Sequence, residues 1–110
     1  MATTPEQTPA DQLLIEELRK NAKQATNLLK ALANENRLMI LCYLDGKELS
    51  VSELNSCLDL SQSALSQHLA VLRRDNLVKT RRESPTIYYS LNGDEAKNII
   101  ITLHSMYCAT

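Results

Sequence analysis

Apolar side chains recur at helical spacing along most of this chain and at strand spacing in one short part of it. From Asp11, Leu and Ala residues follow one another at intervals of three and four as far as Leu32, which predicts a first helix capped by Asp11. This stripe is long for a small domain, so we expect part of it to pack against a second protomer. Residues 1–10 are polar and contain two prolines, and we expect a disordered tail there.

A second helix is predicted over residues 35–44 by an asparagine at its start and a glycine turn after its end. Asn34 can accept a hydrogen bond from the backbone of the first turn, and Gly46 permits the left-handed conformation that ends many helices. Cys42 lies among apolar residues of this helix, where a thiol is most often a small buried hydrophobe.

Two further helices follow in close succession. Ser50 and Glu53 match a capping box and start a short helix that runs to about residue 58. Ser61 caps the next helix, which runs to about residue 75 after a turn of a few residues. Two helices of these lengths joined by so tight a turn predict a helix-turn-helix motif.

The last third of the chain predicts a β-hairpin and a closing helix. Residues 77–82 and 86–91 are rich in β-branched and Tyr residues, with a short Pro-containing connection between them. Residues 94–107 return to helical apolar spacing. We find no internal repeat and no linker, so residues 11–110 predict one domain of mainly α class: four helices, a two-stranded wing and a fifth helix, a winged helix-turn-helix fold.

Charge is distributed unevenly along the 110 residues, although the net charge is only −1. Residues 61–90 hold five Lys/Arg and two Asp/Glu, whereas residues 1–60 hold six Lys/Arg and nine Asp/Glu. A localised basic segment is typical of a surface that binds nucleic acid. The chain shows neither a signal-like start nor a membrane-length apolar segment, so we expect a cytoplasmic protein with no membrane partner.

The helix that follows Ser61 has a face suited to the DNA major groove. Leu65, Leu69 and Leu72 fall on one side of it, and small polar residues fall on the other. Any solvated helix face is polar, but the basic residues beside the hairpin turn favour DNA as the partner. The residues expected to contact double-stranded DNA are Gln62, Ser63, Ser66, Gln67, His68, Arg73, Arg74, Lys79, Arg81 and Arg82.

The sequence also supports more specific expectations for the recognition helix and for the second strand of the hairpin. Gln67 can bond adenine at two positions, whereas Arg73 and Arg74 are better placed for backbone phosphates. His68 lies at the border of the apolar stripe and either touches phosphate or is half-buried. Tyr88 and Tyr89 alternate across the second strand, so we expect one of them in the core.

Three segments of the sequence resemble the arsenic-repressor (ArsR) family of bacterial regulators. They read ALANENRLMIL at residues 31–41, LSQSALSQHL at 60–69 and IYYSL at 87–91, and the resemblance covers nearly all of residues 25–108. It implies a homodimer built from the first and last helices. It also implies binding to operator DNA, either to repress directly or to displace another DNA-binding protein.

Within this family the sequence resembles the sulfide- and persulfide-responsive repressors. Those proteins carry one cysteine after Ile-Leu in the second helix and another after Tyr at the end of the last, which correspond to Cys42 and Cys108. The resemblance implies that reactive sulfur species link these two cysteines by a disulfide or a polysulfide bridge and that DNA is then released. Cys57 has no counterpart in the resemblance.

Two other interpretations use the same cysteines. A metal- or metalloid-sensing repressor would take Cys42 and Cys108 as ligands, with His104 as a further candidate, yet a closed site needs about four ligands. A small thiol enzyme would need an activated thiolate, whereas the dipole of the last helix disfavours a thiolate at Cys108. We therefore expect no catalytic residue, no metal and no cofactor.

Overall fold

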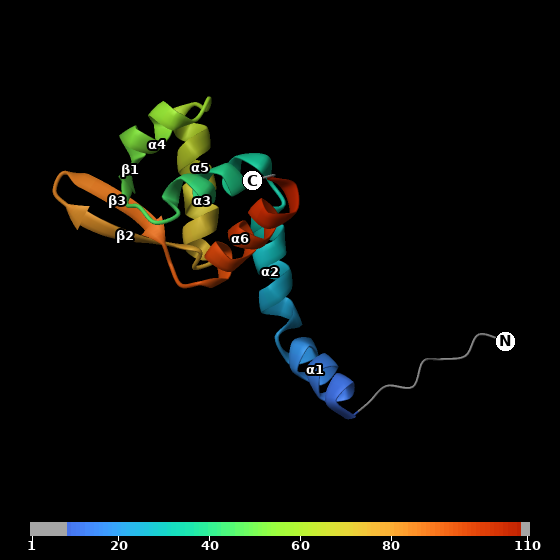
Figure 1. The fold of residues 1–110 in the computed structure, drawn as a ribbon. Coiled ribbons are helices and arrows are strands. Elements are labelled where there is room, and N and C mark those ends of the chain that lie inside the picture. Colours follow the sequence, from blue (N-terminus) through green and yellow to red (C-terminus); the bar gives the residue numbers. More distant parts are fainter. Residues whose placement is uncertain (1–8, 109–110) are drawn as a thin grey trace.

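The computed structural model describes residues 9–108, and within them the chain forms six helices and three strands (Figure 1). The elements are α1 (Pro9–Lys20), α2 (Ala22–Leu32), α3 (Glu35–Leu44), β1 (Leu49–Ser50), α4 (Val51–Cys57), α5 (Gln62–Arg74), β2 (Val78–Glu83), β3 (Thr86–Leu91) and α6 (Glu95–Tyr107). This is a mainly helical winged helix-turn-helix fold, as predicted. Most of the expected tail lies outside the described residues, but Pro9 and Ala10 already belong to α1.

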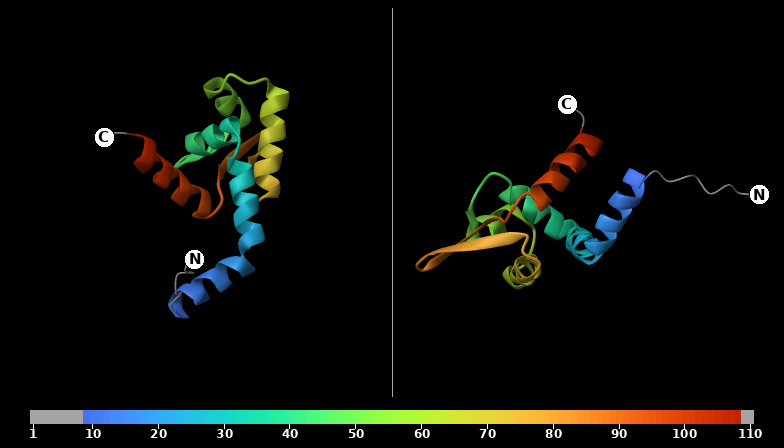
Figure 2. Two further views of the ribbon diagram at one scale, coloured as in Figure 1. Left: turned by 90° about the vertical axis from the view of Figure 1, so that its right-hand side faces the viewer. Right: turned by 90° about the horizontal axis from the view of Figure 1, so that it is seen from below.

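The prediction of one continuous first helix was wrong, because α1 and α2 separate at Asn21. The Asn21 side-chain amide donates to the carbonyl of Glu17 at 3.0 Å. Asn side chains compete for backbone groups in this way and so disfavour a helix interior. Figures 1 and 2 show α1 turning away from the body of the molecule, and none of its residues is buried.

The corner between α2 and α3 is fixed by two polar side chains. Asn34 accepts a hydrogen bond from the backbone N–H of Arg37 at 3.1 Å, which confirms the predicted cap of α3. The Arg37 guanidinium donates to the carbonyls of Ala31 at 2.7 Å and Lys30 at 3.1 Å. These bonds satisfy carbonyl groups that the end of α2 leaves without helical partners.

The core lies where α3, α4, α5 and the base of the wing meet α6. Its fully buried members from the three central helices are Ile40, Leu41, Leu44, Leu54, Leu65, Leu69 and Leu72. The sheet is antiparallel in the order β1-β3-β2, and the two-residue strand β1 was not predicted from the sequence. Within residues 9–108 no helix is both long and apolar enough to cross a membrane.

Replacing Leu65 with Ala is expected to lower the free energy of unfolding by about 2–5 kcal/mol, because the side chain is 0% exposed and its loss leaves a cavity. Urea denaturation at one fixed protein concentration measures this change. Ser66→Ala, at an exposed position of the same helix, is the control and should change stability by less than about 0.5 kcal/mol. Equal effects of the two substitutions would contradict the assignment of Leu65 to the core.

Candidate nucleic-acid interface and cysteine pair

Helix α5 presents the polar face that the sequence predicted. Gln62, Ser63, Ser66 and Gln67 are exposed, while the leucines of the opposite side are buried. The Ser61 hydroxyl accepts a hydrogen bond from the Ala64 N–H at 3.1 Å and caps the helix as expected. The exposed groups nearest the helix N-terminus are therefore short and polar, as contact with base edges in the major groove requires.

The other expected DNA contacts of α5 differ in their surroundings. His68 is half-buried, at the border between the apolar and polar faces. Arg73 is exposed, and no ion pair holds it within the described residues. Arg74 donates to the carboxylate of Asp75 at 3.3 and 3.4 Å, an exposed pair that phosphate can displace at little cost.

Helix α4 is capped at its start and bonded at its end to the turn that leads into α5. Ser50 and Glu53 form both hydrogen bonds of the predicted capping box, at 3.1 and 3.0 Å. At the other end the Asn55 amide donates to the carbonyl of Leu60 at 3.1 Å, across the turn. The turn between the two helices is therefore bonded from within, which fixes the angle at which α5 is presented.

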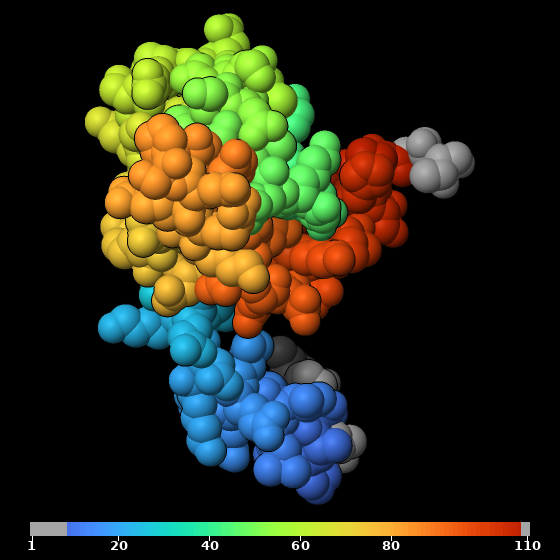
Figure 3. All heavy atoms as spheres, turned by 90° about the vertical axis from the view of Figure 1, so that its left-hand side faces the viewer, coloured from blue at the N-terminus to red at the C-terminus, as the bar shows by residue number. Residues whose placement is uncertain are grey.

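The wing, formed by β2 and β3, has two different faces. Arg81 pairs with Tyr88 in the hairpin register, and Lys79 lies two residues away on the same outer face. Tyr89 lies on the inner face and packs against the core, whereas Arg82 shares that face but is exposed near the hairpin tip. Figure 3 shows the wing, in orange, beside α5, in yellow, on one side of the molecule.

Arg81, one of the expected DNA contacts, is held by two carboxylates. Its guanidinium donates to Glu48 at 2.7, 3.0 and 3.1 Å and to Glu83 at 2.9 Å. Its carbon Cζ lies 4.7 Å from the centre of the Tyr88 ring. The hydrogen bonds from Arg81 lower the pKa of Glu48, and the bonds to both carboxylates raise the pKa of Arg81.

Cys42 and Cys108 are free thiols in different surroundings. Cys42 is half-buried near the end of α3, and Cys108 is exposed at the end of α6, where its N–H donates to the His104 carbonyl at 2.9 Å. The pKa of Cys42 is raised by burial first and then by the negative charges of Asp45 and Cys108. The helices that carry the two cysteines, α3 and α6, pack against each other.

Cys57 does not join this pair. It is exposed at the end of α4, which lies apart from α6 in Figure 1 and in both views of Figure 2. Among residues 9–108, no three His, Cys, Asp or Glu side chains gather in a way that could hold a metal ion.

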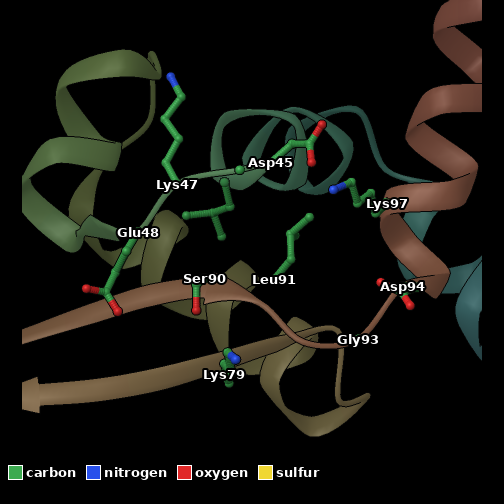
Figure 4. A pocket seen from close by; sticks show the side chains of 11 residues that line it. Asp45, Lys47, Glu48, Lys79, Ser90, Leu91, Gly93, Asp94 and Lys97 are labelled. Atoms are coloured by element: carbon green, nitrogen blue, oxygen red, sulfur yellow. The ribbon is translucent and has the colours of Figure 1, made fainter.

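An open cleft of about 400 Å³ lies between the base of the wing, the end of α3 and the start of α6 (Figure 4). Its wall carries three lysines and three carboxylates and contains no cysteine. A second cleft, of about 670 Å³ beside α2 and the end of α5, also lacks a cysteine. Neither of these two clefts is therefore lined by a thiol, whereas a thiol enzyme would require one in its substrate pocket.

Residues 34–80 match the family described as bacterial regulatory protein, arsR family. The transcriptional activator HlyU of Vibrio cholerae is 58% identical over 86% of this chain and 87% of its own. The biofilm growth-associated repressor of Agrobacterium fabrum is 42% identical over 96% of this chain and 92% of its own. A solved structure of reduced HlyU from Vibrio cholerae matches with a TM-score of 0.79 and 58% identity, covering 86% of this chain and 99% of that one.

The chain belongs to the arsR family of bacterial regulators. It is a transcriptional regulator with a DNA-binding helix-turn-helix fold and not an enzyme. One of its relatives is described as an activator and another as a repressor, so membership in the arsR family establishes regulation through DNA but does not fix its sign.

No sequence pattern marked Glu48, which holds Arg81 of the wing in this arsR-family protein. Glu48 precedes the capping box by two residues and reads as an ordinary surface acid. Its partner Arg81 is 33 positions away, and only the pairing of β1 with β3 brings them together. Knowing that β1 exists would have pointed to this contact.

Alkylation of Cys42 is expected to be slower than that of Cys57 at neutral pH, because Cys42 is half-buried and its pKa is raised above the ordinary value of 9.0. The Cys42 rate should still be rising at pH 9.0, since a raised pKa leaves more than half of its thiol protonated there. Iodoacetamide labelling followed by peptide mass spectrometry measures both rates. A Cys42 rate that levels off near neutral pH would instead indicate an activated thiolate.

Proposed function

We propose that this arsR-family regulator is a cytoplasmic homodimer that leaves its operator when Cys42 and Cys108 become covalently linked by reactive sulfur species. The observation that carries the proposal is the packing of α3, which holds Cys42, against α6, which ends beside Cys108, across 66 positions of sequence. The description of a solved relative as reduced HlyU supports a regulator with more than one thiol state.

The chemistry needs an organic persulfide and two thiols. A thiolate at exposed Cys108 attacks the outer sulfur of the persulfide, so that the organic thiol leaves and Cys108 becomes a persulfide. The thiolate of Cys42 then attacks the inner sulfur of Cys108, a disulfide forms, and hydrogen sulfide leaves. Each further sulfur atom transferred to Cys108 before closure can lengthen the bridge by one sulfur.

DNA recognition is assigned to α5 and the wing. Gln62, Ser63, Ser66 and Gln67 face the base edges, and the basic side chains Arg73, Arg74, Lys79 and Arg82 face phosphates, with His68 at the edge of the contact. Dimerisation is assigned to the first and last helices. Their exposed apolar side chains include Leu13, Leu14, Leu18, Ile101, Met106 and Tyr107.

The bridge would act through α6, which carries Cys108 at its end and belongs to the proposed dimer interface. Linking α6 to α3 changes the angle between protomers and moves the two α5 helices off the spacing of about 34–36 Å that one turn of DNA sets.

Thiol capping after persulfide exposure tests the proposal. The reduced protein is treated with an organic persulfide, free thiols are capped, and peptides are analysed by mass spectrometry. We expect Cys42 and Cys108 in one linked species, with or without additional sulfur, while Cys57 is capped. Capping of both Cys42 and Cys108 to the same extent as in untreated protein would refute the switch.

A further inference from the structure

We propose that Arg81 is a positioning residue that holds the wing to the helix-turn-helix and is not itself a phosphate contact. This inference rests on the proposed DNA-binding role of α5 and the wing. It differs from the expectation drawn from the sequence, in which Arg81 is one of three equivalent basic residues beside the hairpin turn.

The Arg81 side chain reaches from the edge strand β2 across β3 to Glu48, the residue before the other edge strand, β1. Arg81 belongs to β2, its register partner Tyr88 belongs to the central strand β3, and Tyr88 also pairs with Ser50 of β1. The guanidinium lies over the Tyr88 ring and reaches Glu48, two residues before Ser50. Because Ser50 is also the N-cap of α4, the contact joins the wing to the segment that leads into the helix-turn-helix.

The geometry of this contact is stronger than that of an ordinary surface ion pair. Both Nε and Nη2 of Arg81 donate to Glu48, and Nη1 donates to Glu83, so the planar fork is used on two sides. Isolated exposed pairs contribute little, but bidentate geometry and shared networks are the exceptions. A phosphate could take the Nε–Nη2 edge of Arg81 only by displacing Glu48.

Lys79 and Arg82 provide the contrast within the same hairpin. Both are exposed, and neither forms an ion pair within the part of the chain that the structure describes. They remain available to phosphates while Arg81 fixes the strand that carries them. β1 pairs with β3 through only two residues, so this short pairing gains most from an additional link across the sheet.

Hydrogen exchange on the DNA-free protein tests the inference independently of DNA binding. In Arg81→Gln and in Glu48→Gln, the backbone amides that pair β1 with β3 should exchange about tenfold faster than in the wild type. Arg82→Gln removes the same charge from the neighbouring position and should leave this exchange unchanged. Wild-type protection of these amides in Arg81→Gln would overturn the inference.

Affinity for a mixed-sequence DNA duplex gives a second test. A positioning role and a phosphate-contact role of Arg81 predict opposite changes in this affinity for the Glu48→Gln variant. If Arg81 positions the wing, Glu48→Gln weakens binding; if Arg81 contacts phosphate, the same substitution frees it and strengthens binding. Asp59→Asn removes one carboxylate from the turn between α4 and α5 and controls for charge alone. Stronger binding by Glu48→Gln than by Asp59→Asn would refute the positioning role, whereas failure of wild-type protein to bind any duplex would refute the proposed function instead.

Discussion

Cys42→Ser protein is expected to stay on operator DNA after exposure to an organic persulfide, under conditions that release the wild-type protein. The bridge needs two sulfur atoms, and a serine hydroxyl cannot attack the Cys108 persulfide to close it. Specific operator binding typically exceeds non-specific binding by 10³-fold or more, so release of the wild type should lower its affinity by at least about 100-fold. The Ser variant should change by less than about twofold.

Fluorescence anisotropy with a labelled duplex, selected by the reduced wild-type protein from a random-sequence library, measures this difference. Cys108→Ser should behave as Cys42→Ser does, because either substitution removes one end of the bridge. Cys57→Ser is the matched control and should respond as the wild type does, since Cys57 lies at the end of α4. Persulfide-induced release of Cys42→Ser protein would show that another site senses the inducer.

The parts of the fold that were predicted from sequence are those specified by local interactions. Asn34, Ser50 and Ser61 each accept a hydrogen bond from a backbone N–H three residues later, and each marks a helix start that was placed correctly. The Leu stripe of α5 likewise fixes its buried face within one helix. Such features need only a few neighbouring residues to be recognised.

The parts that were missed depend on competition or on distant contacts. The apolar spacing of α1 continues without a gap into α2, although the helical backbone is interrupted at Asn21. The spacing therefore predicted one helix where the structure has two. Strand β1 has two residues, too few for an alternating pattern, and forms because Leu49 meets Tyr89. The apolar spacing marks neither feature, and the only local sign of the break is Asn21 itself, whose side chain bonds to the backbone of Glu17.

The cysteine pair shows the same limit at the candidate site. Sequence spacing gives no sign that Cys42 and Cys108 approach each other, and the family resemblance alone suggested it. The packing of α3 against α6 supplies the physical link. Burial first, and then the negative charges of Asp45 and Cys108, raise the pKa of Cys42, so its surroundings do not activate it as a thiolate.

Replacing Leu14 and Leu18 together with Glu is expected to give a folded monomer that has lost tight operator binding. These side chains lie one turn apart on α1 and are 66% and 64% exposed in the protomer, so they support the fold little. If they pack against the partner, burying two carboxylates in that interface is too costly for the dimer to form. A monomer engages one half-site instead of two, and the loss of linked binding should lower operator affinity by about 10²–10⁴-fold.

Analytical ultracentrifugation and circular dichroism of the double variant separate the two effects. We expect the sedimentation of a monomer together with helix content close to that of the wild type, because α1 contributes no buried residue to the protomer core. Gln12→Glu adds a carboxylate to the exposed polar side of the same helix and should remain a dimer with wild-type affinity. A double variant that still sediments as a dimer would place the interface elsewhere, and a monomer with wild-type operator affinity would show that each protomer reads DNA alone.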